Sequence, residues 1–417
     1  MTVPLTEVGM RADPRLVLAD RIYYGWVVVI ACLLASIAVF GTSYAFGVFY
    51  DAFIATFAVS RTVLAVVFGL QTALLYVTGV AAGQFVERYG QRFTAAISGL
   101  FLTIGVLWTA FARSYLELVV SFGVVAAIGM GGLYVIGYAS VPLWFDRRRG
   151  AATGIASAGL GIGLVTVPPT ADALITTVGW RGAMLAIAVV VFVLSALVTL
   201  LFADDPAAVN IEGRVAADSA PTPDGGNVAH VRSVVLSRRF LLVFVGWVLV
   251  FAPLYVLLGH AVLYADDAGF GRSVGVFAVT AIGIATTVAR LGVAGLSDWA
   301  GRTRTFVVCG AVMALSSIGI ALAPSSVTFL ACVAVFGVGY GGCGGLLGAL
   351  VADLFGNTDL NTLFAAMSLS LGVAGIAAPP LAGLVFESVG GYPLAFLGFG
   401  GGGLLGAGCI ALAVRIG

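Results

Sequence analysis

The sequence predicts an all-α membrane protein with twelve transmembrane helices, and its composition, its apolar runs and the chemistry of the bilayer support this fold class. Of the 417 residues, 61% are hydrophobic and 9% are charged, whereas a soluble domain carries about 25% charged residues. Apolar runs of about 20 residues, enough to cross a hydrocarbon core of roughly 30 Å, recur along the whole chain. Because lipid offers the backbone no hydrogen-bond partners, runs this long and this apolar must be helices.

The apolar runs fall into two groups of six. The expected spans of the first group are 23–48, 62–86, 93–112, 115–143, 150–172 and 181–202. Those of the second group are 239–264, 273–297, 305–323, 326–352, 361–386 and 392–414. Residues 203–238 are hydrophilic and rich in Pro, Gly, Asp and Arg, which is typical of a linker. We therefore expect an N-terminal segment (1–22), a six-helix bundle (23–202), a linker (203–238) and a second six-helix bundle (239–417).

All twenty cationic residues are arginine, and their distribution predicts the orientation in the membrane. If the N-terminus is cytoplasmic, the inner side holds Arg11, Arg15, Arg21, Arg88, Arg92, Arg147, Arg148, Arg149, Arg214, Arg232, Arg238, Arg239, Arg302, Arg304 and Arg415. The outer side then holds only Arg61, Arg113, Arg181 and Arg272. The positive-inside rule thus favours a multi-pass protein of the cytoplasmic (inner) membrane with both termini in the cytoplasm.

A short motif is repeated at corresponding places in the two halves. The second span is followed by "GQFVERYGQR" (83–92) and the eighth by "GLSDWAGRTR" (295–304). The first glycine of each copy permits close helix packing, the second permits a tight turn, and an acid faces basic residues at a helix end. We expect this latch to comprise Gly83, Glu87, Arg88, Gly90 and Arg92 in the first half, and Gly295, Asp298, Gly301 and Arg302 in the second.

Twelve spans in two halves that share this loop resemble the major facilitator superfamily. The resemblance implies two pseudo-symmetric six-helix bundles that rock about a substrate site near the membrane midplane. Glu87 departs from the pattern, since an aspartate is usual at this position.

Two further stretches resemble the bacterial branch of the monocarboxylate transporter family and the related oxalate:formate antiporters. They are "YYGWVVVIACLLASIAVFGTSYAFGVFYDAF" (23–53) and "LWFDRRRGAATGIASAGLGIG" (143–163). The physical interpretation of the second stretch is structural, because small residues thin the helix and the arginines anchor its end at the headgroups.

Arg290 lies alone inside the eighth span, eight residues, or roughly 12 Å, before Asp298. A buried guanidinium costs at least about 2.5–3.5 kcal/mol to insert, so it needs an anion, carbonyl groups or a wet cavity. No acid lies within the apolar cores, and a planar guanidinium suits a carboxylate. The resemblance also implies that Arg290, in "TTVARLGVAG", binds the substrate carboxylate. The structural alternative is an arginine that reaches the cytoplasmic side or bonds to carbonyl groups.

Other candidate residues follow from position in the resemblance. Some relatives carry a proton-coupling acid one turn before the arginine, where this chain has Thr286. Tyr134 matches a pocket tyrosine of the fourth span, and Phe336 and Tyr340 share a helix face where relatives place aromatic residues. His260 titrates in the useful pH range and is a candidate for a proton-linked role, with an interhelical hydrogen bond as the alternative.

Two lysines that the families named above carry are absent from this chain. Leu371 lies near the position of the antiporter lysine in the eleventh span, and Val48 near that of a lysine of animal relatives. With one cation in the cavity, a single carboxylate is the natural substrate.

The sequence therefore predicts a secondary transporter of small monocarboxylates, lactate- or pyruvate-like, that is proton-coupled and works by alternating access. An oxalate/formate-type antiporter of organic anions and a drug or metabolite exporter remain alternatives, and a receptor would need an attached signalling domain. No nucleophile–base–orienter cluster and no nucleotide-binding loop is evident, which argues against an enzyme. Besides the lipid bilayer we expect no cofactor, no metal and no nucleic-acid partner.

Overall fold

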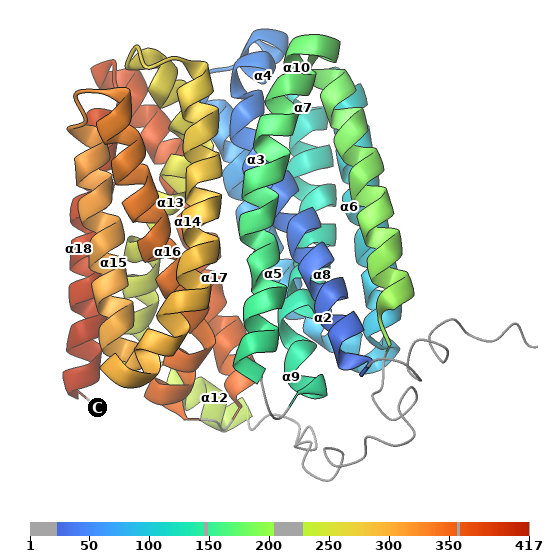
Figure 1. The fold of residues 1–417 in the computed structure, drawn as a ribbon, viewed down its shortest axis with the longest axis vertical. Helices are drawn as coiled ribbons and strands as arrows, with labels where there is room; N and C mark the ends of the chain where they lie inside the picture. The colour runs from blue at the N-terminus through green and yellow to red at the C-terminus, as the bar shows by residue number, and fades with distance from the viewer. Residues whose placement is uncertain (1–22, 146–148, 204–227, 357–358, 417) are drawn as a thin grey trace, which may run out of the picture.

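The computed structural model describes residues 23–145, 149–203, 228–356 and 359–416, which form two helical bundles standing side by side (Figure 1). The N-terminal bundle is blue to green and the C-terminal bundle is yellow to red in that view. The end that carries α12 (Val228–Val235) and the C-terminus is called the linker end, and the opposite end, which carries α4 (Tyr50–Phe57), is called the distal end. The segment 1–22 and most of the expected linker lie outside the described residues.

The first half contains the six expected spans. The helices in chain order are α2 (Gly25–Ser36), η1 (Ile37–Gly41), α3 (Thr42–Ala45), η2 (Phe46–Phe49), α4, α5 (Arg61–Tyr89), α6 (Gln91–Phe111), α7 (Tyr115–Leu118), η3 (Val119–Ala126), α8 (Ala127–Ala139), α9 (Val141–Trp144) and α10 (Arg149–Leu201). The segments from α2 to α4 form one span, and those from α7 to α8 form another. Each of these two spans contains a π-helical segment, η1 or η3.

The second half is more regular. Its helices are α12, α13 (Arg238–Asp267), α14 (Arg272–Ala300), α15 (Arg302–Ala321), α16 (Ser326–Phe355), α17 (Leu360–Val389) and α18 (Pro393–Ile416). Across the described residues, eleven helical stretches are long and apolar enough to cross a membrane. One of them, Ala152–Leu201, turns back at Gly179, where φ is +73°, so it contains the fifth and sixth expected spans.

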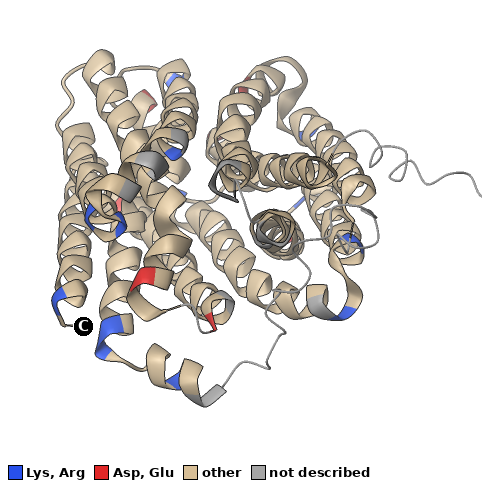
Figure 2. Ribbon diagram, turned by 60° about the horizontal axis from the view of Figure 1, so that its bottom comes forward, with Lys and Arg blue, Asp and Glu red and all other residues tan. Residues whose placement is uncertain are grey.

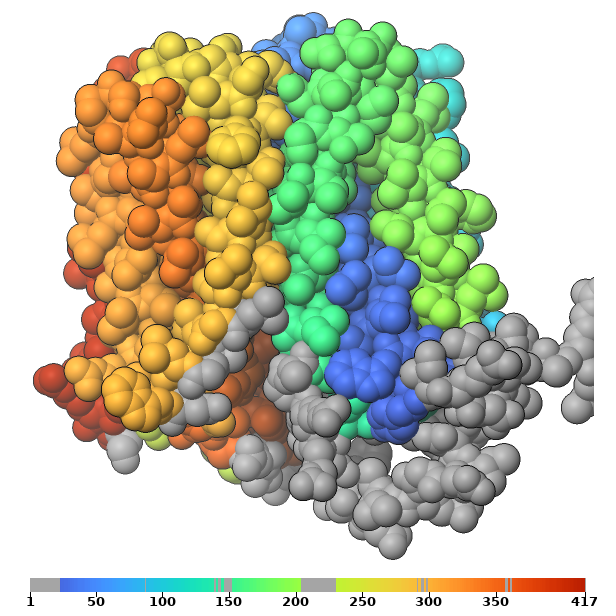
Figure 3. All heavy atoms as spheres, in the orientation of Figure 1, coloured from blue at the N-terminus to red at the C-terminus, as the bar shows by residue number. Residues whose placement is uncertain are grey.

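The bundles meet along two helix pairs, α5 with α17 and α10 with α14. Figure 3 shows green α10 against yellow α14 on one face of the molecule. Glycine permits this approach, because a Cβ on Gly161 of α10 would lie 2.7 Å from the carbonyl oxygen of Gly283 in α14. Figure 2 shows the charged residues mainly near helix ends, with most of the helical ribbon uncharged. This is the distribution that a bilayer requires.

The repeated latch motif has the predicted turns. Gly90 and Gly301 both end a helix with a positive φ, +84° and +89°, that side chains rarely adopt. The close packing expected at Gly83 is not present in this conformation, because a Cβ there would meet no atom within 4 Å. The side chains of Glu87 and Asp298, the surroundings of Gly295 and the side chains of Arg147–Arg149 lie outside the described part of the chain.

Candidate functional site

A central cavity of about 580 Å³ lies between the bundles and extends towards the linker end. Arg290 lines it, and so do Ser297 and Arg302, which lie nearer the linker end of α14 and at the start of α15. Among the described lining residues, Arg290 and Arg302 are the only charged groups. Leu371 also lines the cavity, where it presents an apolar side chain.

Arg290 is 6% exposed and has few polar contacts. Its Nη1 donates to the hydroxyl of Tyr138 at 3.3 Å, and its Cζ lies 5.8 Å from the ring centroid of Tyr340. Its Nε has no hydrogen-bond partner, and no described carboxylate forms an ion pair with it. A buried cation with unused donors on a cavity can accept a carboxylate, because such an anion supplies both charge and acceptor oxygens.

Glycines of α16 leave the space that the guanidinium of Arg290 occupies. A Cβ on Gly344 would lie 2.6 Å from Nη2 of Arg290 and 3.2 Å from its Cζ, so the guanidinium occupies the space that a side chain would take. One turn earlier, a Cβ on Gly341 would lie 2.5 Å from the carbonyl oxygen of Thr286. The glycine-rich face of α16 therefore holds α14 close and leaves room for the arginine.

Tyrosines surround the arginine, and sequence reasoning found only part of them. Tyr134 and Tyr340, two of the predicted pocket residues, both line the cavity. Tyr138, which bonds to Arg290, and Tyr76 and Tyr255, whose hydroxyls lie 3.2 Å apart, were missed. The four-residue spacing of Tyr134 and Tyr138 was the available signal, because it puts both on one helix face.

Two other predicted pocket residues lie away from the cavity surface. Phe336 is fully buried in the core, and it is not among the described residues that line the cavity. Thr286 is also fully buried, and its hydroxyl donates to the carbonyl oxygen of Gly337 at 3.2 Å. In this conformation Thr286 joins α14 to α16 rather than facing the cavity.

His260 lies on the distal side of the cavity, fully buried in α13. Its Nε2 lies 3.0 Å from the carbonyl oxygen of Pro379, which can only accept, so Nε2 carries a proton. Its Nδ1 lies 3.0 Å from the hydroxyl of Tyr392. Both ring nitrogens therefore have hydrogen-bond partners, one in α17 and one in the loop before α18, and His260 is not among the described residues that line the cavity.

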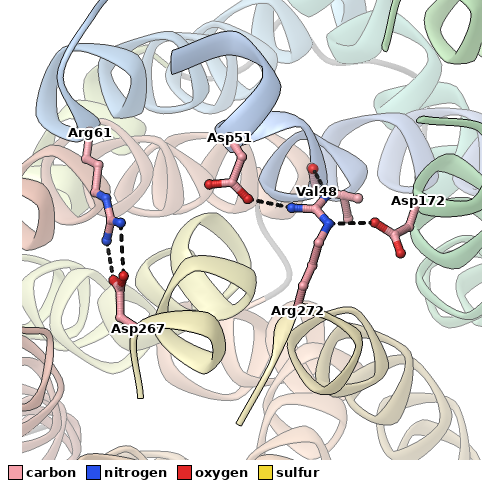
Figure 4. Close-up of polar contacts among 6 residues, drawn as sticks. All are labelled: Val48, Asp51, Arg61, Asp172, Asp267 and Arg272. Atoms are coloured by element: carbon pink, nitrogen blue, oxygen red, sulfur yellow. Dashed lines mark hydrogen bonds and ion pairs between the residues drawn. The ribbon is translucent and has the colours of Figure 1, made fainter. Parts of the chain in front are cut away.

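Ion pairs between the bundles close the distal end (Figure 4). Arg272, at the start of α14, donates from Nε to Asp172 at 2.9 Å and from Nη2 to the carbonyl oxygen of Val48 at 2.7 Å, and it also pairs with Asp51. All three acceptors belong to the N-terminal bundle, whereas Arg272 belongs to the C-terminal bundle. One guanidinium thus joins α10 and the first span to α14.

In a second distal contact the arginine belongs to the N-terminal bundle and the carboxylate to the C-terminal bundle. Arg61, at the start of α5, pairs with Asp267 of α13, including a contact of 3.1 Å from Nη2 to Oδ1. Its Cζ also lies 4.0 Å from the ring centroid of Phe386 in α17. Glu387 accepts the backbone N–H of Thr62 at 3.0 Å and so caps α5 from the other bundle. We call Arg61, Asp267, Arg272, Asp51 and Asp172 the distal ion-pair network.

At the linker end, the described polar contacts of the latch residues join neighbouring helices of the same bundle. Arg92 donates from Nε to the carbonyl oxygen of Thr199 at 3.2 Å, between α6 and α10. Arg302 pairs with Asp353 of α16 at 3.4 Å. The guanidinium of Arg88 lies 5.3 Å from the ring centroid of its neighbour Tyr89. Within the described residues, no group of three or more His, Cys, Asp or Glu side chains could hold a metal ion.

Curated proteins similar to this chain are transporters. The monocarboxylate transporter 3 of Rattus norvegicus is 28% identical, with 89% of this chain and 76% of the relative covered. The monocarboxylate transporter 11 of Mus musculus is 27% identical, with 90% and 84% covered. The MFS transporter asaE of Aspergillus flavus is 24% identical, with 94% and 86% covered.

Solved structures show the same fold at low sequence identity. A bacterial homologue of the human lysosomal transporter Spinster, inward-facing and unoccupied, superposes with a TM-score of 0.73 at 15% identity, covering 94% of this chain and 97% of that one. A D-xylose-proton symporter gives a TM-score of 0.71 at 15% identity, covering 93% and 97%. The family model of the Major Facilitator Superfamily matches residues 31–348 and 301–416. The chain therefore belongs to the Major Facilitator Superfamily, and it is a multi-pass membrane transporter that resembles the monocarboxylate transporters of that family.

Proposed function

We propose that the protein carries small monocarboxylates, lactate- or pyruvate-like, across the cytoplasmic membrane, with both termini in the cytoplasm. One observation carries the proposal: Arg290 is a buried cation on the central cavity, its Nε has no partner, and no described acid pairs with it. The substrate carboxylate supplies the missing anion. The sequence identity of 28% and 27% with two monocarboxylate transporters supports this substrate class.

Transport proceeds by alternating access of the bundles 23–202 and 239–417. In this conformation the cavity extends to the linker end while the distal ion-pair network joins the bundles at the other end. A carboxylate that enters from the linker end reaches Arg290. Separation of the distal pairs, with closure of the latch glycines and arginines at the linker end, then exposes the site to the opposite side.

Proton coupling is part of the proposal. The proton travels with the substrate carboxylate or through a titratable group such as His260, because Thr286 replaces the acid of some relatives.

Uptake of labelled pyruvate and lactate into proteoliposomes under an inward proton gradient tests the proposal. Arg290→Ala and Arg290→Lys are expected to lower uptake at least about 100-fold, because the planar two-point carboxylate contact is lost. Tyr138→Phe removes one hydrogen bond to Arg290 and keeps the ring, so it is expected to lower uptake only severalfold. Normal uptake by both Arg290 variants, with folding checked by thermal melting, would contradict the proposal.

A further inference from the structure

The central cavity is walled by aromatic rings from both bundles. The rings that line it are Phe40, Tyr76, Tyr134 and Tyr138 of the N-terminal bundle, and Phe251, Tyr255 and Tyr340 of the C-terminal bundle. They surround the one deeply placed cation of the cavity, and their large surface is more than a carboxylate with two or three carbons can contact. A cavity of about 580 Å³ lies within the range of roughly 300–1,000 Å³ that holds ligands of drug size.

The four rings of the N-terminal bundle form one connected array. The centroids of Tyr134 and Tyr138 are 5.0 Å apart, those of Tyr76 and Tyr134 are 5.5 Å apart, and those of Phe40 and Tyr134 are 6.1 Å apart. All three distances fall in the range of favourable aromatic pairs, about 4.5–7 Å. Tyr134 lies at the centre of this array and is only partly buried, so its ring is accessible from the cavity.

The hydroxyl groups of several of these tyrosines already have polar partners. Tyr76 and Tyr255 pair their hydroxyls at 3.2 Å, and the hydroxyl of Tyr340 lies 3.5 Å from that of Tyr44. The hydroxyl of Tyr138 accepts from Arg290. With their polar tips engaged in this way, these side chains present ring faces and edges to a ligand. Such surfaces favour another ring over a polar group.

The charges of the residues that line the cavity narrow the substrate class further. No described lining residue is an acid, so the ammonium group of an amino acid would lie in the cavity without a counter-charge. A second carboxylate would find no cation beside Arg290, because Arg302 lies beyond Ser297 at the linker end of the cavity. The wall therefore suits a ligand with a single charge and an uncharged remainder.

We propose that the preferred substrate is a monocarboxylate that carries an aromatic ring, with its carboxylate on Arg290 and its ring against Tyr134. This inference rests on the proposed function and deepens it by naming the substrate class. An aryl group buried against the tyrosines removes apolar surface from water and adds ring–ring contacts. Affinity is therefore expected to be roughly tenfold higher than for a short aliphatic acid with the same head group.

Three acids with the same carboxylate head group separate the effect of an aromatic ring from that of a larger apolar group. Uptake of labelled propanoate, 3-phenylpropanoate and 3-cyclohexylpropanoate is measured in proteoliposomes at neutral pH, with protein-free vesicles to correct for passive entry. The expected KM is roughly tenfold lower for the phenyl acid than for propanoate, and severalfold lower than for the cyclohexyl acid, because only the phenyl ring pairs with aromatic side chains. Phenylalanine, which adds an ammonium group, is expected not to compete.

Trans-acceleration distinguishes a substrate from a blocker. External 3-phenylpropanoate is expected to accelerate the efflux of preloaded labelled propanoate, because the carrier returns loaded. Slowing of efflux would overturn the inference, since the aryl acid would then bind without being transported. Equal KM values for propanoate and the phenyl acid would also overturn it.

Tyr134 variants give a second and independent readout. Tyr134→Leu is expected to raise the KM for the phenyl acid severalfold and that for propanoate less than twofold, and Tyr134→Phe is expected to restore both. Equal effects on both acids would assign Tyr134 a merely structural role and contradict the ring contact. If Arg290-dependent uptake occurs without aryl preference, the aryl inference fails and the proposed function stands. If no acid enters by an Arg290-dependent route, the proposed function itself fails.

Discussion

The two ends of the molecule use their charges differently. At the distal end, arginines of each bundle pair with carboxylates of the other, as Arg272 does with Asp172 and Arg61 does with Asp267 (Figure 4). At the linker end, the described pair between Arg302 and Asp353 lies within the C-terminal bundle. Contacts that cross between rigid bundles hold one end together, whereas contacts inside a bundle leave the other end able to separate. In the described part of the chain, the ion pairs that cross between the bundles lie at the distal end, and the cavity extends towards the linker end.

An apolar layer lies beside the distal charges. Val48 of the first span packs with Val262 of α13 and Val276 of α14, and each is at most 5% exposed. Because these three valines belong to both bundles, they can become accessible only when the distal end opens. A cysteine at Val276 would therefore report distal opening.

The strongest test removes the central cation of the distal network. Arg272→Gln loses charge contacts to two carboxylates and leaves Asp51 and Asp172 facing each other without a cation. Labelling of Val276→Cys by a membrane-impermeant thiol reagent is expected to rise roughly tenfold, which corresponds to about 1.4 kcal/mol. The network is partly exposed, so a larger effect is not expected.

The matched control is Arg239→Gln, measured in the same background with the five native cysteines replaced. Arg239 lies at the linker end of α13, and it donates to the carbonyl oxygen of Ala413 within its own bundle. Its loss should leave labelling of the distal cysteine unchanged. An equal rise in both variants would show that labelling follows general loosening, and the comparison of the two ends would fail.

A smaller effect is expected at the cavity. Gly344→Ala adds a Cβ that would lie only 2.6 Å from Nη2 of Arg290, so the guanidinium must shift. Such a shift at a carboxylate site is expected to raise the KM for transported acid roughly fivefold. Gly348→Ala is the control, because it lies one turn further along α16 on the same cavity and its Cβ would meet no atom within 4 Å. A similar rise in KM for both variants would remove the steric explanation.

A partial loss in the distal network should have a weaker effect than loss of the arginine. Asp172→Asn leaves Arg272 its pairing with Asp51 and its hydrogen bond to Val48. Distal labelling is expected to increase about twofold to threefold, in keeping with a partly exposed ion pair worth less than about 1 kcal/mol. High ionic strength should abolish the difference from wild type. A change as large as that of Arg272→Gln would mean that Asp172 alone holds the end closed.

The sequence predicts local features better than pairings over distance. The spans, the turns at Gly90 and Gly301 and the isolation of Arg290 follow from runs, spacing and charge along one segment. Phe336 shows the limit of such reasoning, because helix positions four residues apart differ by about 40°. In this conformation Tyr340 lines the cavity, whereas Phe336, about one turn nearer the distal end of α16, is buried in the core.

The pairings of the distal ion-pair network cannot be predicted from the sequence, for a different reason. Arg272 is 221 residues from Asp51 and 100 from Asp172 along the chain. No periodicity links such positions, and the charges at helix ends have many potential partners. Only the packing of α10 against α14 and of α5 against α17 determines which of them meet. The set of tyrosines that line the cavity depends on the same packing, because they come from helices of both bundles.

The smallest predicted effect tests the latch at Gly83. In this conformation a Cβ there would meet nothing, so Gly83→Ala should not weaken the fold. Alanine is the better helix former by up to about 1 kcal/mol, so the melting temperature should stay level or rise slightly. If the linker end closes over Gly83 during transport, as the repeated motif suggests, the same variant should slow uptake and lower distal labelling, because the distal end opens as the linker end closes. Unchanged uptake would show that helices do not approach closely at Gly83 in either conformation, and the latch would then reduce to the turns at Gly90 and Gly301 and their charges.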